Sequence, residues 1–273
     1  MTTVGDDDVA IALEAVQGNA GIGRVVEVGA RAAGLADKRV LVGPIDPCGE
    51  CEVCRRGGAA VCPMARRRTA WPSRIVAAGR WVIPLDAGLD ARAPEGAAIA
   101  GDVALAYTLY ARTGAAPREP VVVVGAAPVT RFLVEILGAK GLTFAVVASG
   151  AEAWTAWLAT KGAAVAADAT ALEAVFATSG LARRPWRVIA TSADSVATAA
   201  ALAGPRATLT VLAPIAALPG ELAAREVTVI TVAGAHPDLV VEAAAMCVKG
   251  EIDLAGGTAR EPTADHRAVV EPR

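Results

Sequence analysis

Residues 48–62 read CGECEVCRRGGAAVC and hold four of the five cysteines of the chain, Cys48, Cys51, Cys54 and Cys62. Gaps of two residues let neighbouring thiolates converge on one ion, and the longer last gap lets the backbone turn back to supply a fourth ligand. Four sulfur donors close a tetrahedral shell and leave no position for water or substrate. The stretch therefore predicts a metal centre that holds a loop in place and takes no part in chemistry.

Zinc is the metal that this spacing favours. An iron–sulfur cluster is an alternative because Pro63 follows the last cysteine, although the bacterial ferredoxin motif has a much shorter final gap. Disulfides and free thiols are the remaining interpretations. Cysteines this close would form strained small rings, and the acidic opening MTTVGDDD is unlike the basic start of a secretory leader. We therefore expect a cytoplasmic protein with a structural zinc ion.

Composition limits the partners that the chain is expected to bind. Its 273 residues are enough for two domains, and the formal net charge of -2 gives no electrostatic signature of nucleic-acid binding. Hydrophobic residues make up 54% of the chain, but Arg206, Pro214 and Pro219 are among the residues that interrupt the apolar stretches before they reach membrane-spanning length. We expect neither a nucleic-acid partner nor a membrane span.

The texture of the sequence changes along its length. Short apolar strands broken by glycine and proline run to about residue 94, whereas strands and helices alternate from residue 120 onward. Six such strands, from VVVVG to EVTVITVAG, predict a doubly wound, Rossmann-type sheet. We place a β domain at residues 1–116 with a cysteine lobe at 44–63, a Rossmann-type domain at 117–255 and a frayed or surface-bound tail at 256–273, an α/β protein overall.

Several segments in this order resemble one enzyme family. The strand GRVVEVG, the strand KRVLV, the cysteine loop and the closing pair REVTVITVAG and EAAAMCVKGEIDL are similar to those of the zinc-containing medium-chain alcohol dehydrogenases, from about Gly18 to Leu254. The resemblance implies a partial GroES-like β-barrel that carries the structural zinc and a Rossmann domain that binds NAD or NADP. It also implies a homodimer that pairs through the strands TLTVLAP and TVITVAG.

The residues that would hold the family's second, catalytic zinc are missing. Its Gly-His-Glu tripeptide is replaced by Gly18-Asn19-Ala20, and no cysteine precedes Cys48. Asp102 falls near the last ligand position, but one carboxylate cannot hold a catalytic ion, and we interpret it as a helix N-cap. We interpret His236, which precedes a proline at a helix start, as a structural residue. No catalytic residue is assigned.

The dinucleotide fingerprint is also altered. A GxGxxG turn needs its second glycine for the pyrophosphate and its third for helix packing, and this chain has alanine and threonine there, at residues 127 and 130. The acid that usually binds the adenosine ribose is replaced by Ala148 and Ser149, and no arginine or lysine follows nearby. We expect Thr130 to push its helix outward. The candidate cofactor-binding residues are Gly125, Ala127, Pro128, Val129 and Ser149.

Both ends of the chain look short for the family, so we expect a partner, either a second copy or another chain, to cover exposed strand edges of the β-barrel. The leading hypothesis is a catalytically degenerate member that acts as a binding or partner subunit. The alternative is an active, zinc-independent NAD(P)H oxidoreductase that positions a carbonyl or enoyl substrate through Tyr107 or Asn19. A third hypothesis is a subunit of a larger dehydrogenase assembly.

Overall fold

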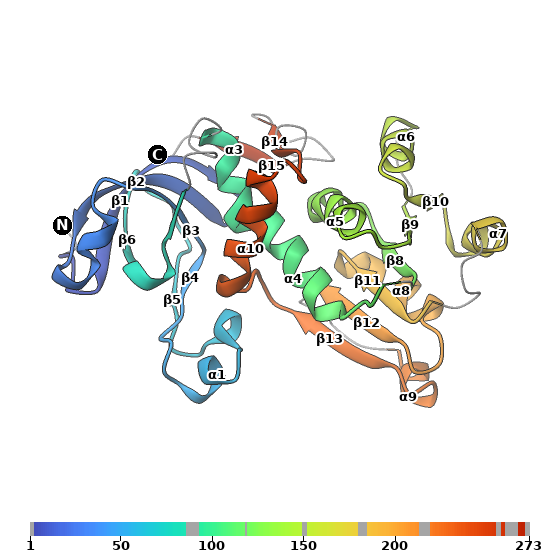
Figure 1. The fold of residues 1–273 in the computed structure, drawn as a ribbon. Coiled ribbons are helices and arrows are strands. Elements are labelled where there is room, and N and C mark those ends of the chain that lie inside the picture. The colour runs from blue at the N-terminus through green and yellow to red at the C-terminus, as the bar shows by residue number, and fades with distance from the viewer. Residues whose placement is uncertain are drawn as a thin grey trace. The chain divides into compact units, whose positions relative to one another are not determined.

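The structure is a computed structural model that describes residues 3–85, 93–117, 119–148, 152–179, 185–212, 219–254, 258–259 and 267–270. The chain forms two compact units (Figure 1). The first contains residues 1–105 and 235–273, and the second contains residues 106–234. This division differs from the one that we expected, because the chain returns to the first unit after residue 234. Helix α10 (Pro237–Val248) then packs against η4 (Ile99–Val103).

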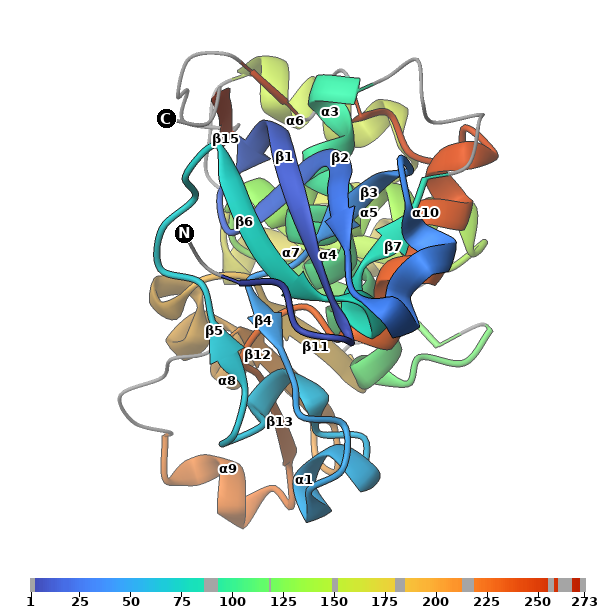
Figure 2. The ribbon, with the colours of Figure 1, turned by 90° about the vertical axis from the view of Figure 1, so that its left-hand side faces the viewer.

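The first unit is built on a seven-stranded sheet. Its strands follow the order β14-β15-β1-β2-β3-β7, and β6 also pairs with β1 (Figure 2). The apolar core beneath it includes Val9, Ile11, Val25 and Val40, all essentially inaccessible to solvent. The strands of this unit are β1 (Asp8–Gln17), β2 (Ala20–Val28), β3 (Arg39–Val42), β4 (Ile45–Asp46), β5 (Arg66–Arg67), β6 (Arg74–Ala78), β7 (Ile83–Pro84), β14 (Thr258–Ala259) and β15 (Arg267–Val270).

Short helices connect these strands. They are η1 (Ala30–Leu35), α1 (Glu52–Arg55), η2 (Ala59–Val61), η3 (Gly79–Trp81) and α3 (Ala93–Ala98), and α4 (Ala104–Thr113) leads into the second unit. No helix in the described part of the chain is both long enough and apolar enough to cross a bilayer.

The C-terminal segment corrects the expected domain division. We expected residues 256–273 to form a frayed or surface-bound tail and both ends of the chain to leave strand edges of the barrel exposed. Instead, β15 pairs antiparallel with the end of β1, with Val16 opposite Val270 and Gln17 opposite Val269. The sequence did not reveal this strand, because a strand of four residues is too short to show a clear alternation of apolar and polar side chains.

The second unit confirms the expected Rossmann-type sheet. Its six strands are parallel and follow the order β10-β9-β8-β11-β12-β13, which is the 3-2-1-4-5-6 order of doubly wound nucleotide-binding folds. All four valines of β8 are buried, as expected for a central strand covered on both faces. The strands are β8 (Val121–Val124), β9 (Phe144–Val147), β10 (Ala164–Ala166), β11 (Arg187–Ala190), β12 (Thr208–Leu212) and β13 (Thr228–Val232).

Helices separate successive strands of this sheet. They are α5 (Pro128–Ala139), α6 (Glu152–Thr160), α7 (Ala169–Ser179), η5 (Ala193–Ser195), α8 (Val196–Leu202) and α9 (Glu221–Ala224). Helix α5 is buried over most of its length, and its largest buried side chains include Phe132, Leu133, Ile136 and Leu137. It follows β8 after a turn of three residues.

Candidate functional site

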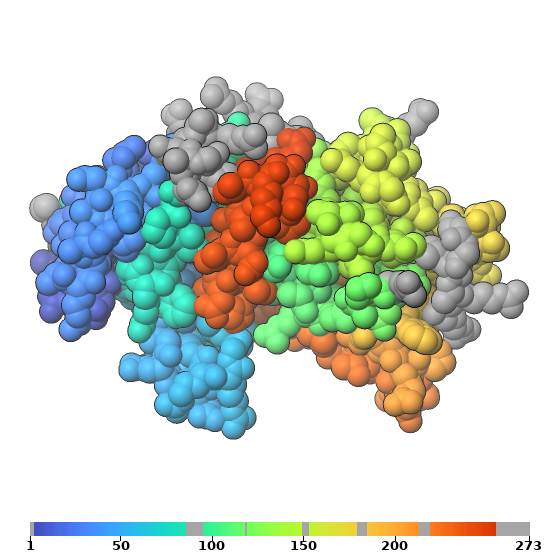
Figure 3. Space-filling model, viewed as in Figure 1, coloured from blue at the N-terminus to red at the C-terminus, as the bar shows by residue number. Residues whose placement is uncertain are grey.

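The cysteine loop is closed at its base by a two-stranded ladder. Strands β4 and β5 pair antiparallel, with Ile45 opposite Arg67 and Asp46 opposite Arg66, so the two ends of the loop lie side by side. Figure 2 shows this ladder leading from the sheet to the lobe that carries α1, and Figure 3 shows the lobe in space-filling form. This pairing fixes the two ends of the cysteine loop, so the loop keeps a defined conformation away from the apolar core.

The four cysteines converge within this lobe. Their sulfur atoms all lie within 4.8 Å of one another. The Sγ of Cys48 is 3.6 Å from that of Cys62 and 4.0 Å from that of Cys54, and the Cys51 and Cys62 sulfurs are 3.8 Å apart. Zinc–sulfur bonds of about 2.3 Å in a tetrahedron place the sulfurs about 3.8 Å apart. The residues therefore fit a structural zinc ion held by four thiolates, as the spacing predicted.

Backbone amides of the loop point at the sulfurs. The N–H of Cys48 donates to Cys62 Sγ at 3.5 Å, that of Cys51 to Cys48 Sγ at 3.4 Å and that of Cys54 to Cys51 Sγ at 3.5 Å. Hydrogen bonds from the backbone N–H groups of Glu50 and Cys51 lower the pKa of the Cys48 thiol to about 6. Partial burial raises the pKa of the Cys54 thiol to about 12. A bound zinc ion would hold the cysteines that coordinate it as thiolates.

Three contacts from outside the loop fix its position. The Nε2 of His236, the buried residue before α10, lies 2.7 Å from the carbonyl oxygen of Gly57, so Nε2 carries the proton and donates. Trp81 Nε1 donates to the Pro47 carbonyl at 2.6 Å, and the Arg80 guanidinium donates to the Cys48 carbonyl. His236 is thus structural, as expected, but its partner is the metal loop, and only the fold reveals that.

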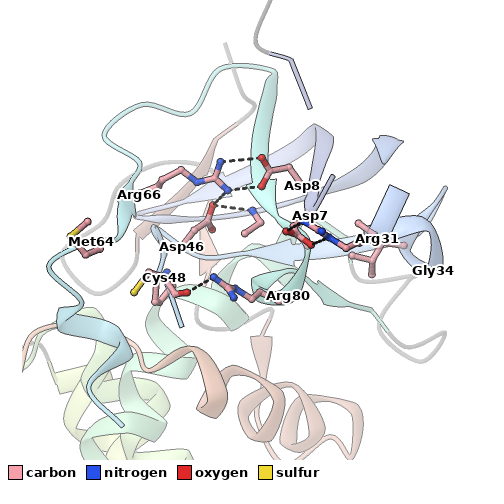
Figure 4. Close-up of a pocket in the computed structure, with 14 residues that line it drawn as sticks. Asp7, Asp8, Arg31, Gly34, Asp46, Cys48, Met64, Arg66 and Arg80 are labelled. Carbon is pink, nitrogen blue, oxygen red and sulfur yellow. Dashed lines mark hydrogen bonds and ion pairs between the residues drawn. The ribbon is translucent and has the colours of Figure 1, made fainter. Parts of the chain in front are cut away.

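A cavity of about 740 Å³ lies beside the loop and is bordered by ion pairs (Figure 4). At its edge the buried carboxylate of Asp46 accepts from Arg68 Nη2 at 2.6 Å and from the Ala78 N–H at 3.0 Å. Arg66 bridges Asp46 and Asp8. Arg66 and Arg68 therefore anchor β4 to the sheet. The sequence carried no signal for Asp46, because its partners Arg66, Arg68 and Ala78 lie 20 or more residues further along the chain.

The residues that the family resemblance sets at a second zinc site lie in the first unit. Asn19 is exposed at the turn between β1 and β2, and Ala20 is buried at the start of β2. Asp102 is buried just after a kink at Gly101, where the backbone leaves helical geometry. Within the described ranges, the four cysteines are the only group of three or more His, Cys, Asp or Glu residues whose donor atoms lie close enough to hold a metal.

The β8–α5 turn depends on the glycine at its start and on buried hydroxyl groups. Gly125 has a φ of +113°, and a Cβ there would lie 2.6 Å from Thr191 Oγ1, so only glycine fits. Thr130 is fully buried, and its hydroxyl lies 2.9 Å from the hydroxyl of Thr191. Thr191 in turn donates to the Val124 carbonyl at 3.2 Å. A pair of threonine hydroxyls thus accommodates the side chain that we expected to displace the helix.

The other candidate cofactor residues flank this turn. Ala127 is the N-cap of α5 in an extended conformation that alanine adopts without strain, Pro128 is the first helical residue and Val129 is buried. Ser149 lies outside the described residues. Tyr107, a candidate for substrate positioning, is mostly buried, with its ring edge-on to Tyr110 and under Lys140, so its surroundings do not favour that role.

The sequence and the structure were compared with known proteins. No protein-family model and no curated protein matches the sequence. Solved structures match over most of the chain. An alcohol dehydrogenase of Escherichia coli CFT073 in complex with NADH is 17% identical, with a TM-score of 0.78 over 93% of this chain and 84% of the other. Alcohol dehydrogenase from Thermus sp. ATN1 is 15% identical, with a TM-score of 0.78 and coverage of 93% and 85%.

Galactitol-1-phosphate dehydrogenase from Escherichia coli is 17% identical, with a TM-score of 0.77 over 95% of this chain and 88% of the other. The chain has the fold of the medium-chain alcohol dehydrogenases. At these identities the likeness concerns the fold. The alcohol dehydrogenase fold here carries four cysteines whose sulfurs fit a structural zinc centre.

Proposed function

We propose that this chain is a zinc-stabilised, dinucleotide-binding protein of the alcohol dehydrogenase fold that has no catalytic zinc centre and acts as a binding or partner subunit. The observation that carries the proposal is the contrast between two metal positions in the first unit. The four cysteines keep the sulfur spacing of a tetrahedral zinc site. Gly18-Asn19-Ala20 offers no imidazole or carboxylate where a catalytic zinc would need both.

Dinucleotide binding is supported by the β8–α5 turn. Gly125 holds its left-handed conformation, α5 begins with proline at its first position, and the strand order places this turn where doubly wound folds bind their ligands. The dipole of a helix makes its N-terminus favourable for an anion such as a pyrophosphate. We propose NAD(H) or NADP(H) as the ligand.

Two measurements test this proposal. Elemental analysis of purified protein is expected to give one zinc per chain, and two zinc ions per chain would contradict the absence of a catalytic centre. Titration with NADH and NADPH, followed by quenching of tryptophan fluorescence, is expected to show saturable binding. Failure of both dinucleotides to bind would remove the dinucleotide part of the proposal and leave the structural zinc untouched.

The alternative function is that of an active, zinc-independent oxidoreductase. An activity assay on the same purified protein distinguishes the two functions. An active enzyme would consume bound NADPH or NADH when carbonyl or enoyl substrates are added, with absorbance at the nicotinamide band falling over time. The degenerate protein would bind the dinucleotide without turnover. Turnover that persists after contaminating zinc-dependent dehydrogenases have been removed from the preparation would favour the alternative.

We also propose a homodimer that pairs through β13. This strand lies at the end of the six-stranded sheet, and within the described residues it pairs only with β12. Three of its five residues are apolar, and two of these, Val229 and Ile230, remain partly exposed. Unpaired edges of this kind favour pairing with another chain. The edge of β1 is a weaker candidate, because β6 and β15 already pair along it.

Sedimentation analysis tests the dimer. Wild-type protein is expected to sediment as a dimer at micromolar concentration, and Ile230→Lys is expected to shift it to monomer because the lysine would lie at the pairing edge. A wild-type monomer would contradict the proposal.

We further propose a cytoplasmic location, since a four-thiolate zinc site needs its cysteines reduced.

A further inference from the structure

The cavity beside the cysteine loop is built entirely from residues of the first unit (Figure 4). Its volume of about 740 Å³ is large enough for a small organic ligand. The β8–α5 turn, where we propose that dinucleotides bind, belongs to the second unit. The cavity is therefore a candidate binding site that shares no residue with the proposed dinucleotide site.

The carboxylates of this cavity already have cationic partners. Asp7 accepts from Arg31 Nε at 2.6 Å, and Asp8 accepts from Arg66 Nη2 at 2.8 Å. The buried Asp46 accepts from two arginines, as described above. Each carboxylate is thus paired with at least one guanidinium, so the cavity is not arranged to bind a further cation.

Arg80 differs from the other arginines of the cavity. Its guanidinium donates to the Cys48 carbonyl oxygen, and its guanidinium carbon lies 5.8 Å from the centre of the Trp81 ring. It forms no ion pair with a carboxylate in the part of the chain that the structure describes. A guanidinium has five N–H donors in a planar fork, so one hydrogen bond to a carbonyl leaves donors for an anion.

The backbone of the cysteine loop holds the Arg80 side chain in place. Gly49 has a φ of +76°, and a Cβ there would lie 3.1 Å from the guanidinium carbon of Arg80, so the arginine lies against bare backbone. The hydrogen bond from Arg31, and to a smaller degree the charges of Arg31 and Arg80, lower the pKa of the Asp7 carboxyl. The charge of Arg80 therefore acts within the cavity.

The charges and the apolar wall of the cavity together define the ligand. When Arg68, the partner of Asp46, is counted with the lining residues, four guanidiniums face three carboxylates and leave one net positive charge. One net charge suits a monoanion better than a dianion. Apolar side chains also line the cavity, among them Leu35, Pro47 and Met64. A ligand that matches both features has one carboxylate and a hydrocarbon body.

We propose that this cavity binds a small monocarboxylic acid. The fork of Arg80 holds the carboxylate by two hydrogen bonds, because guanidinium and carboxylate are planar groups of matching geometry. The hydrocarbon part of the acid lies against the apolar wall. This site goes beyond the proposed dinucleotide binding and does not depend on it.

The test is isothermal titration of zinc-loaded protein with hexanoate, acetate and 1-hexanol. Wild type is expected to bind hexanoate about tenfold or more tightly than 1-hexanol, which lacks the charge, and than acetate, which lacks the hydrocarbon chain. Arg80→Met removes the guanidinium and is expected to weaken hexanoate about tenfold while leaving 1-hexanol unchanged. Arg55→Met, at an exposed arginine of α1 that does not line the cavity, is the matched control and should change neither affinity.

A second pair of variants keeps the test decisive if Arg80→Met fails to retain zinc, because Arg80 also supports the metal loop. Arg31→Met leaves Asp7 without its partner and should weaken hexanoate about threefold, whereas Asp7→Asn frees Arg31 and should strengthen it about threefold. Zinc content and far-ultraviolet circular dichroism show that each variant is folded.

Three results would overturn the inference and leave dinucleotide binding standing. The first is an absence of hexanoate binding, and the second is equal affinity for hexanoate and 1-hexanol. The third is a change of hexanoate affinity in the same direction for Arg31→Met and Asp7→Asn, because the two substitutions alter the charge of the cavity in opposite senses.

Discussion

The cysteine loop and the β8–α5 turn are both short segments between elements of the fold, but they keep their geometry by opposite means. The loop retains every residue type that its metal needs, and the four sulfurs stand at tetrahedral spacing. The turn has lost two glycines of its fingerprint, yet Gly125 still holds its positive φ and the hydroxyls of Thr130 and Thr191 hold helix against strand. Identity of residues preserves the first site, and compensation between distant residues preserves the second.

The difference shows what a substitution means in each setting. A zinc ligand has no neighbour that can replace it, because the metal needs a donor atom at that position. A buried glycine can be replaced by threonine if the hydroxyl finds an acceptor nearby. Replacement of a metal ligand is therefore expected to weaken a site more than replacement of a glycine at the β8–α5 turn.

Removal of a zinc ligand is expected to have the largest effect. Cys62→Ala deletes a fully buried sulfur of the cluster and leaves three donors. We expect loss of the zinc ion and a fall of about 4 kcal/mol or more in the free energy of unfolding, because metal binding contributes directly to folding of such loops. Zinc content by elemental analysis and urea unfolding measure both. Cys247→Ala, at a buried cysteine of α10 outside the cluster, is the control and should keep its zinc.

Loss of an outer contact of the loop is expected to have a smaller effect. His236→Ala removes the 2.7 Å hydrogen bond to the Gly57 carbonyl but leaves all four sulfurs. We expect a loss of about 2 kcal/mol and zinc release to a chelator that is about tenfold faster, since such supports orient metal ligands. Glu242→Gln, at an exposed residue of the same helix, should release zinc at the wild-type rate. Unchanged release from His236→Ala would show that the loop holds its geometry alone.

The same contrast explains what the sequence could predict. Four cysteines within fifteen residues form a site without help from the rest of the chain, so their spacing was sufficient. The six parallel strands were also predictable, because each is a buried apolar run between helices. His236, Asp46 and the Thr130–Thr191 pair were not, because each depends on a partner at least 20 residues away. The return of β15 to β1 was missed for the same reason.

The hydroxyl pair of the turn gives the third test of the comparison. Thr130→Val keeps the shape of the side chain but removes the hydrogen bond to Thr191. We expect a loss of about 1–2 kcal/mol in the free energy of unfolding, because Thr191 then keeps only the Val124 carbonyl as a partner. Urea unfolding measures it. Thr170→Val, at an exposed residue of α7, controls for the change of side chain. A loss as small as that of the control would mean that the turn does not depend on this compensation.

The smallest expected effect lies at the opposite ends of the strands that carry this turn. Glu119, before β8, accepts from the Ala116 N–H at 3.0 Å and from Arg187 Nε of β11 at 2.9 Å. The hydrogen bond from the Ala116 N–H, followed by that from Arg187, lowers the pKa of the Glu119 carboxyl below its usual value. A lowered pKa stabilises the fold above the usual pKa of glutamate, near 4.3, and this contribution is lost as the pH falls through the lowered pKa.

We therefore expect wild type to exceed Glu119→Gln by about 1 kcal/mol in free energy of unfolding at pH 7, and the difference to shrink as the pH falls below about 4. Glu173→Gln, at an exposed residue of α7, should show no such dependence. A difference independent of pH would mean that the ion pair does not join β8 to β11. The Thr130–Thr191 pair would then be the contact that joins β8 and α5 to β11 at the turn. The cysteine loop, by comparison, is held by several contacts from outside it.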